Sequence, residues 1–224
     1  MDLKEEARRE GRKLRNMSWQ DRIWYIWEYY KFHFLALLLV IGLISVVATS
    51  LYRRTFTTRL SLAIVNDRSG GMSHTDTLEE ELRSLLGCGP KDVIEFNEGL
   101  YATFDDSNAS QYAYASIMKL TALAASGDLD ILITDLPVLE HYNQTQAFQD
   151  LSRLLPSGLY ERAEESLLFL PDAQGNQVPV ALSLANTSLP ALTGISMDPP
   201  YLAVMAGSGR TEAVLQMIQY LFPE

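Results

Sequence analysis

The sequence predicts an α/β protein in which one N-terminal transmembrane helix precedes a single domain built on a doubly wound, mainly parallel sheet. Two observations predict it: an uncharged apolar run from Phe34 to Leu51, and an alternation of short apolar runs with amphipathic segments over residues 60–224. Strands that alternate with helices form parallel sheets, because each helix carries the chain back to the same edge. The 224 residues, 47% of them hydrophobic, suffice for one core and a membrane segment.

The apolar run predicts a membrane-spanning helix over residues 32–52. Its core, Phe34–Leu51, holds eighteen residues without a charge. At a rise of about 1.5 Å per residue, about 20 such residues cross the hydrocarbon core of a bilayer. A buried helix of a soluble protein is the alternative, but such a helix usually keeps a polar stripe. A cleaved signal peptide is a second alternative, with Val46 and Ala48 before the cut, although the run exceeds the usual apolar length of about 7–15 residues.

Aromatic residues directly precede this run and predict an interfacial amphipathic helix. Tryptophan and tyrosine have amphipathic rings that suit the lipid headgroup level. Residues 1–31 are therefore expected to comprise a cytoplasmic charged segment followed by this interfacial helix. The residues expected at the membrane interface are Trp19, Trp24, Trp27, Tyr29, Tyr30 and Lys31.

The charge distribution bears on orientation and on partners. Residues 1–31 carry a net charge of +2, whereas residues 60–224 carry −15. An acidic soluble part repels phosphate backbones, which argues against nucleic acid. Basic residues flank the span on both sides, but the short first segment holds more of them. We therefore expect a single-pass protein of the plasma membrane, with the lipid bilayer as a partner, a cytoplasmic N-terminus and an extracytoplasmic C-terminal domain.

After a linker at residues 53–59, apolar runs bounded by turn-forming residues predict five strands. The first is RLSLAIV, which ends in NDRSGG, a composition that stops a strand and turns the chain. The second, DVIEF, and the third, LDILIT, each follow a predicted helix, and the fourth follows the DAQGN turn. The five predicted strands are Arg59–Val65, Asp92–Phe96, Leu129–Thr134, Gln177–Leu184 and Tyr201–Ala206.

Apolar residues at helical spacing, together with capping residues, predict the helices between these strands. Thr75 or Asp76 is expected to cap the first helix and Gly87 to close it, while Asp106 or Ser107 is expected to cap the second, with Gly127 ending it. In the last helix, Val214, Met217, Ile218 and Leu221 share one face. The predicted helices are Asp76–Leu86, one from Asp106 or Ser107 to Ser126, Ala147–Leu155, Tyr160–Leu168 and Thr211–Phe222.

Polar residues follow the first three predicted strands. In open parallel sheets, ligands bind beyond the carboxyl ends of the strands. Glycines after the first strand would let backbone amides approach an anion at the next helix, although an ordinary strand-to-helix loop explains the same residues. The candidate ligand-binding residues are Asn66, Asp67, Arg68, Ser69, Gly70 and Gly71 after the first strand, Asn97 with its neighbour Glu98 after the second, and Thr134 and Asp135 after the third.

No pattern in the sequence predicts a catalytic, metal or cofactor site. The carboxylate pairs Asp105–Asp106 and Asp128/Asp130 stand at a helix start and a strand start, where capping and turn roles explain them. His74 and His141 have no Cys or carboxylate at ligand spacing and are expected to be solvated. Nucleophile, zinc-protease, Walker and C-x-x-C motifs are absent from the sequence. We therefore expect no catalytic residue, no metal and no cofactor.

Several segments resemble the extracytoplasmic solute-binding proteins, whose domain is the type 2 periplasmic-binding fold. The segment YIWEYYKFHFLALL is similar to the start of membrane-anchored proteins from Gram-positive bacteria that carry such domains. The resemblance covers most of residues 60–222 and implies the fold of one lobe. Its segments are GDLDILITD (Gly127–Asp135), FQDLSRLLP (Phe148–Pro156), GNQVPVALS (Gly175–Ser183) and YLAVMAGSGRTEAVLQMIQYLF (Tyr201–Phe222).

One departure from the family bears on function. The resemblance implies that a second lobe is inserted between the strands at Gln177–Leu184 and Tyr201–Ala206, yet only the sixteen residues Ala185–Pro200 separate them. A folded lobe needs at least about 50 residues. We therefore expect a single lobe that serves as a membrane-tethered, non-enzymatic interaction or accessory domain with a membrane or extracytoplasmic protein partner. A tethered small-molecule-binding module that serves a transporter or sensor is the alternative.

Overall fold

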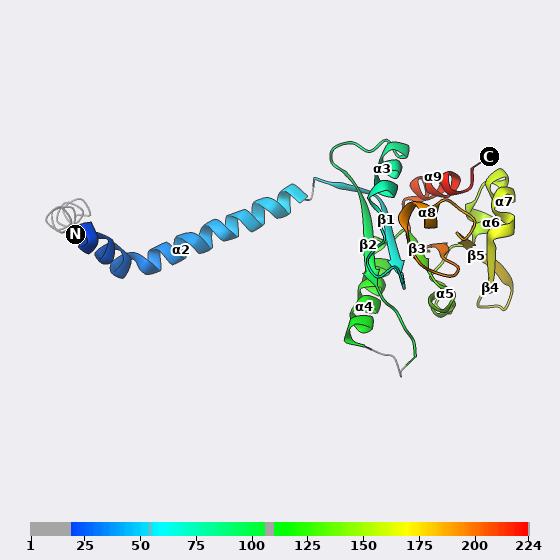
Figure 1. Cartoon of the computed structure of the whole chain (residues 1–224), viewed down its shortest axis with the longest axis horizontal. Helices are drawn as coiled ribbons and strands as arrows, with labels where there is room; N and C mark the ends of the chain where they lie inside the picture. Colours follow the sequence, from blue (N-terminus) through cyan, green and yellow to red (C-terminus); the bar gives the residue numbers. More distant parts are fainter. Residues whose placement is uncertain (1–18, 54, 106–109, 224) are drawn as a thin grey trace. The chain divides into compact units, whose positions relative to one another are not determined.

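The computed structural model describes residues 19–53, 55–105 and 110–223. The chain divides into two compact units, Met1–Thr55 and Phe56–Glu224. The described part of the first unit consists of helix α2 (Trp19–Arg53), and the second unit contains the sheet domain (Figure 1).

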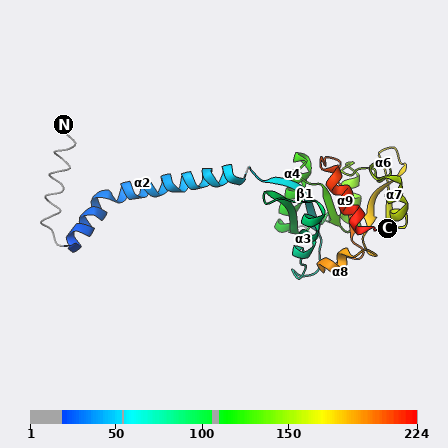
Figure 2. The ribbon, with the colours of Figure 1, turned by 90° about the horizontal axis from the view of Figure 1, so that it is seen from above.

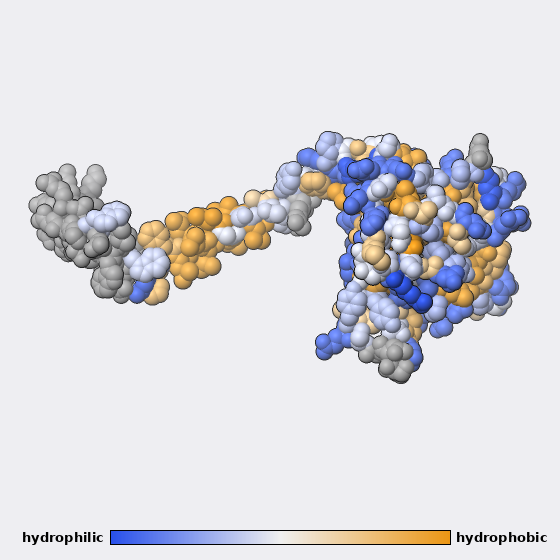
Figure 3. All heavy atoms as spheres, viewed as in Figure 1, coloured by the Kyte–Doolittle hydropathy of each residue, from blue (hydrophilic) through white to orange (hydrophobic). Residues whose placement is uncertain are grey.

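Helix α2 joins the predicted interfacial and membrane segments in one continuous helix of 35 residues. Within it, Lys31–Tyr52 is long and apolar enough to cross a bilayer. Its large apolar side chains are 47–71% exposed, and Figure 3 shows them as a continuous apolar surface. Trp19 and Trp27 are also exposed, and the Lys31 Nζ lies 5.8 Å from the ring centroid of Phe32. The side chains of Trp24, Tyr29 and Tyr30 lie outside the described part of the chain.

The described residues of the second unit form one six-stranded sheet in the order β2-β1-β3-β6-β5-β4. Strand β1 pairs in parallel with both β2 and β3, whereas β6 lies antiparallel between β3 and β5, and β4 pairs antiparallel with β5. Four strands, β2, β1, β3 and β5, therefore run in the same direction. The strands are β1 (Thr57–Val65), β2 (Asp92–Leu100), β3 (Ile131–Thr134), β4 (Leu167–Pro171), β5 (Gln177–Ser183) and β6 (Tyr201–Val204).

Helices cover both faces of the sheet (Figures 1 and 2). Alternate residues of β1 separate two cores, because successive side chains of a strand point to opposite faces. Leu60, Leu62 and Ile64 pack with α3 and α6 to α9, whereas Ala63 and Val65 pack with α4 and α5. The helices are α3 (Asp76–Leu85), α4 (Gln111–Ser126), α5 (Leu136–Asn143), α6 (Leu151–Leu154), α7 (Ser157–Ala163), the 3₁₀ turn η2 (Glu164–Ser166), α8 (Leu189–Thr193) and α9 (Thr211–Leu221).

The first and third strands, the second crossover helix and the last helix occur where the sequence predicts them, within a few residues. Strand β1 begins earlier than expected, since Thr57 pairs with Asp92 and Thr58 with Val93. Part of the predicted linker at residues 53–59 therefore belongs to the sheet. Strand β2 runs on to Leu100, and its pairing with β1 shifts register near that end.

The predicted N-terminal caps of α3 and α4 either make no capping hydrogen bond or lie outside the described residues. Thr75 stands at the N-cap of α3, but its side chain makes no capping hydrogen bond. Helix α4 begins at Gln111, because the Ser110 side chain accepts a hydrogen bond from the Ala113 N–H. Asp106 and Ser107 lie outside the described part of the chain. Gly127 ends the helix as expected, with φ at 71°, and its N–H donates to the Ala124 carbonyl.

The predicted helix Ala147–Leu155 is largely wrong, whereas the predicted helix Tyr160–Leu168 is helical as far as Ser166, through α7 and η2. Phe148 instead forms a bridge with Met205, and only α6 is helical in the first segment. In the second, Leu167 starts the edge strand β4, which pairs with β5. Over such short runs, the apolar residues of both segments fit the periodicity of a helix as well as that of a strand. Pairing with a neighbouring strand therefore decides where the chain becomes extended.

A buried ion pair joins β1, β3 and α9. The Asp130 side chain is fully buried, and its Oδ2 lies 3.0 Å from Arg210 Nη1 and accepts a 2.9 Å hydrogen bond from the Ser61 N–H. Its Oδ1 accepts from Ser208 Oγ at 2.6 Å, while Arg210 Nε donates to the Thr58 carbonyl at 3.0 Å. Asp130 thus has a structural role at the amino end of β3.

Candidate functional site

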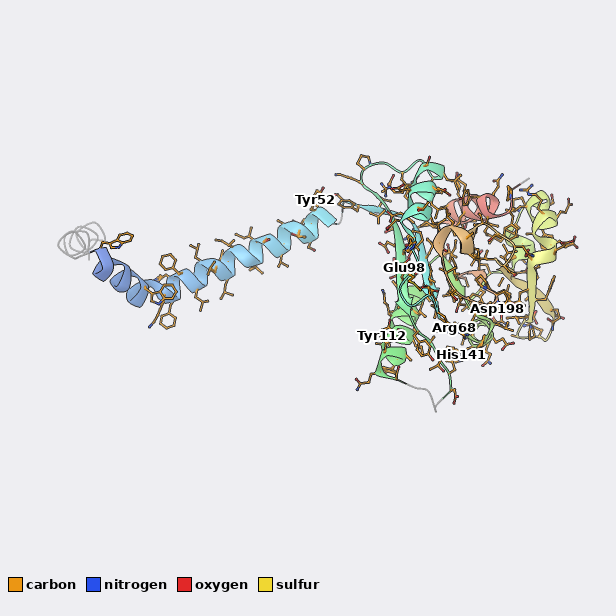
Figure 4. All side chains as sticks on the ribbon, viewed as in Figure 1. Tyr52, Arg68, Glu98, Tyr112, His141 and Asp198 are labelled. Carbon is orange, nitrogen blue, oxygen red and sulfur yellow. The ribbon has the colours of Figure 1, made fainter. Side chains whose placement is uncertain are left out.

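A pocket of about 990 Å³ lies at the carboxyl ends of β1, β2 and β3. Its walls come from four parts of the chain: the loop after β1, the end of β2 with the segment that follows it, the start of α4, and helix α5 with its caps. Figure 4 labels Arg68, Glu98, Tyr112 and His141 on these elements, and all four line the pocket. The hollow therefore lies at the edge of the sheet where ligands of open α/β proteins bind.

Asn66 connects the three strand ends beneath this pocket. Its backbone N–H donates to the Leu100 carbonyl, and its side chain exchanges hydrogen bonds with the backbone of Ala102, at 3.0 Å and 2.9 Å. The same Nδ2 lies 3.1 Å and 3.2 Å from the carboxylate oxygens of Asp135. Asn66 has a φ of 64°, a conformation that asparagine tolerates better than most residues. This one side chain therefore fixes the positions of the three strand ends, which form the floor of the pocket.

Asp67 holds the loop after β1 in place. Its carboxylate accepts hydrogen bonds from the Ser69 N–H at 3.0 Å, the Ser69 hydroxyl at 2.6 Å and the Ser196 N–H at 2.8 Å. Burial alone would raise the pKa of Asp67, but these bonds and the Ser73 side chain outweigh burial and lower the pKa below its usual value. The charged form is therefore the one that the fold stabilises.

Replacing Asp67 with asparagine is expected to destabilise the protein by about 1–3 kcal/mol at pH 7, the range for hydrogen bonds to a charged group. Because folding lowers this pKa, the stabilisation is present above the unfolded value of about 3.9 and is lost as the pH falls through the folded value. Thermal unfolding of the full chain at pH 7 and at pH 2–3 measures the difference. Glu161→Gln, on the exposed side of α7, is the control. An Asp67→Asn effect that is equally large at both pH values would contradict the argument.

The pocket brings together six of the ten residues named as its candidates. These are Asn66, Asp67, Arg68, Gly71, Glu98 and Asp135. The other four do not: Ser69 is buried and donates to Asp67, Thr134 is fully buried, the Asn97 side chain donates to the Leu62 carbonyl at 3.4 Å, and Gly70 lies in the turn, with a φ of 68°.

The sequence interpretation missed an aromatic wall. Tyr101, Phe104, Tyr112 and His141 line the pocket, and Phe104 stacks on His141 with ring centroids 3.4 Å apart and planes 7° apart. His141 is exposed, as expected, but it is part of the pocket rather than isolated. The Tyr112 hydroxyl donates to the Gly99 carbonyl, which holds the start of α4 against the end of β2.

The suggested anion site at a helix N-terminus is not favoured by the described residues around it. The first turn of α3 carries Asp76 and Glu79, whose charges repel an anion. At α5, the N-cap residue is itself an acid, Asp135. The pocket as a whole is acidic, since five carboxylates and one arginine line it; the acids are Asp67, Glu98, Asp105, Asp135 and Glu140.

The described residues show no arrangement that suits a metal ion. Among them, no group of three or more His, Cys, Asp or Glu side chains converges as a metal site would require. Asp128 and Asp130 point to different surroundings, because Asp128 is exposed and bonded to the Ser126 hydroxyl, whereas Asp130 is buried with Arg210.

Comparison with protein-family models, with curated proteins and with solved structures found no match to this chain.

Proposed function

We propose that this protein is a membrane-tethered, non-enzymatic domain that binds a small molecule outside the cytoplasm. The observation that carries the proposal is the pocket of about 990 Å³ at the carboxyl ends of three neighbouring strands. Its volume lies at the upper end of the range of about 300–1,000 Å³ typical of small-molecule sites. Of the two functions that the sequence leaves open, the pocket favours the ligand-binding module that serves a transporter or sensor.

The construction of the floor supports binding at this place. A ligand site gains affinity when its groups are held before the ligand arrives, because less motion is lost on binding. Asn66 is fixed by bonds to Ala102 and Asp135, and Asp67 by bonds to Ser69 and Ser196. These groups lie at strand ends, which gives the walls a rigid base.

The tether is the second part of the proposal. Lys31–Tyr52 is long and apolar enough to span a bilayer, and we propose that it anchors the protein in the plasma membrane. The excess of basic residues before the span supports a cytoplasmic N-terminus. Such an anchor would keep the pocket close to membrane proteins that receive the ligand.

We propose further that the domain is one lobe of a type 2 periplasmic-binding fold. The order β2-β1-β3-β6-β5, with β6 antiparallel between its neighbours, supports this proposal. The connection from Ser183 to Tyr201 contains only the five-residue helix α8 in place of a second lobe. A ligand in this pocket would therefore be held by one lobe.

The second candidate function is an interaction domain that docks on a partner protein. The exposed side of α4 favours it, because Tyr114 and Met118 are 68% and 52% exposed and lie one helical turn apart. A pulldown from detergent extract tests this candidate. The interaction-domain candidate predicts a partner protein that is lost from the Tyr114→Ser/Met118→Ser variant and kept by Gln144→Trp, which fills the pocket. A chain recovered alone and monomeric would argue against this candidate.

A thermal-shift screen of the detergent-solubilised chain tests ligand binding. Amino acids, amines, sugars, peptides and organic acids serve as probes, since a solute that binds only the folded state must raise the unfolding temperature. Gln144→Trp, which fills the pocket from the end of α5, is expected to abolish the shift. Glu161→Trp, at an exposed position of α7, is the matched control. If no solute class shifts the wild-type protein, the proposed function is wrong.

A further inference from the structure

We infer that the pocket selects organic cations, that is, small ligands with one or more ammonium groups on a short apolar frame. The inference rests on the proposed function, because it assumes that the pocket binds a ligand at all. Its two supports are independent of each other: the charge of the walls and the aromatic rings in the same lining.

The charge of the lining residues favours a positive ligand. Five carboxylates and one arginine contribute to the walls, within a domain that is itself acidic. Walls that carry charges of one sign raise the local concentration of ligands of the opposite sign. An anionic ligand would have to overcome this field, whereas an ammonium group is drawn in by it.

Two of the carboxylates are free to contact such a ligand. Asp67 and Asp135 already hold the floor through Ser69, Ser196 and Asn66. Glu98 of β2 and Glu140 of α5 are exposed, and their side chains make no hydrogen bond or ion pair with the described residues. They belong to two different walls of the pocket. We assign them the role of pairing with ligand ammonium groups.

Aromatic rings line the same pocket. Tyr101, Phe104 and Tyr112 are 41%, 38% and 58% exposed, so a ligand can reach part of each ring. The faces of such rings attract a cation within about 6 Å of the centroid. His141 stacks against Phe104 and supports its orientation. Carboxylates and ring faces together form the type of wall that binds alkylated ammonium groups.

Arg68, by contrast, would favour an anionic ligand. It lines the same pocket, is exposed, and forms no ion pair with the described residues. A ligand that carries a carboxylate would pair with it. The experiment must therefore separate ligands held by Glu98 and Glu140 from ligands held by Arg68.

Isothermal titration of the detergent-solubilised full chain makes this separation with three four-carbon probes of the same length: 1,4-diaminobutane, 1,4-butanediol and succinate. Tetramethylammonium serves as a fourth probe for the aromatic wall. We expect the diamine and tetramethylammonium to bind and the diol and succinate not to bind. Glu98→Gln and Glu140→Gln should each weaken diamine binding about tenfold, and Phe104→Leu should weaken tetramethylammonium binding. Glu161→Gln, outside the pocket, should change neither.

The outcomes distinguish this inference from the function on which it rests. Binding of succinate, or of neutral solutes, without binding of either cation would overturn the inference and leave a ligand-binding pocket. If succinate binds, loss of succinate binding in Arg68→Gln would show that the pocket is an anion site. Cation binding that persists in the Glu98→Gln/Glu140→Gln double variant would also overturn it. If no solute of any class binds to the wild-type chain, the proposed function itself fails.

Discussion

Replacing Arg210 with methionine is expected to destabilise the sheet domain by about 3–5 kcal/mol, the cost of leaving a buried charge without its partner. Asp130 is fully buried, and Arg210 supplies the positive charge 3.0 Å away. Methionine keeps much of the apolar stem of the side chain, so the main loss is the charge and its hydrogen bonds to Asp130 and Thr58.

Urea unfolding of the solubilised full chain, followed by tyrosine circular dichroism in the near ultraviolet, measures this effect. Arg153→Met is the matched control, because that arginine is 87% exposed and its pair with Asp150 is worth about 0–1 kcal/mol. The double variant Asp130→Asn/Arg210→Met should regain part of the loss, since no buried charge then remains unpaired. An Arg210→Met variant within about 0.5 kcal/mol of the wild type, the usual range of surface substitutions, would show that solvent reaches Asp130.

The double substitution Ile41→Arg/Ile44→Arg is expected to remove the protein from the membrane. An arginine at the centre of a spanning helix costs about 2.5–3.5 kcal/mol on insertion scales, so two cost about 5–7 kcal/mol. Both positions lie near the middle of Lys31–Tyr52 and are exposed on α2. The anchor proposal predicts a wild-type chain that stays in the membrane fraction after alkaline carbonate extraction and a variant that does not.

Ile41→Leu/Ile44→Leu is the control and should remain in the membrane fraction. The wild-type chain also separates an anchor from a cleaved signal sequence. Cleavage would shorten the chain and remove all three tryptophans, which precede residue 31. Its size and its tryptophan fluorescence therefore report whether it is cleaved. Protease added to intact cells then reports the side on which the domain lies. A double-arginine variant that stays membrane-bound after carbonate extraction would mean that another part of the protein holds it there.

Local pattern is enough to predict the elements at the centre of the sheet. Strand β1 carries Leu60, Leu62 and Ile64 on one face and smaller apolar residues on the other. Because both faces are buried against apolar residues, the strand appears in the sequence as a nearly continuous apolar run. Helix α9 was predictable because its apolar residues at helical spacing face one core. At the edge, the segment Leu167–Pro171 becomes a strand only by pairing with β5, and no local pattern specifies that partner.

Some residues of the pocket could likewise be predicted from local sequence, whereas others come together only through the fold. Asn66, Asp67 and Asp135 directly follow strands, so the rule for parallel sheets places them together. Phe104 and His141 meet only because helix α5 directly follows β3 and the segment after β2 folds toward it. One signal was available: Asp135 followed by Leu136–Pro137 is a typical helix start, and it would have placed His141 on a helix beside the strand ends.

The Asn66 side chain attaches the base of the pocket to the sheet. Because this side chain joins the ends of β1, β2 and β3, the base of the pocket depends on the sheet and not on the residues above it. Arg68, Glu98, Phe104 and Glu140 are exposed on the walls and contribute little to the core. Under the proposed ligand-binding function, substitutions in the walls would change specificity at little cost in stability, because the base does not depend on them.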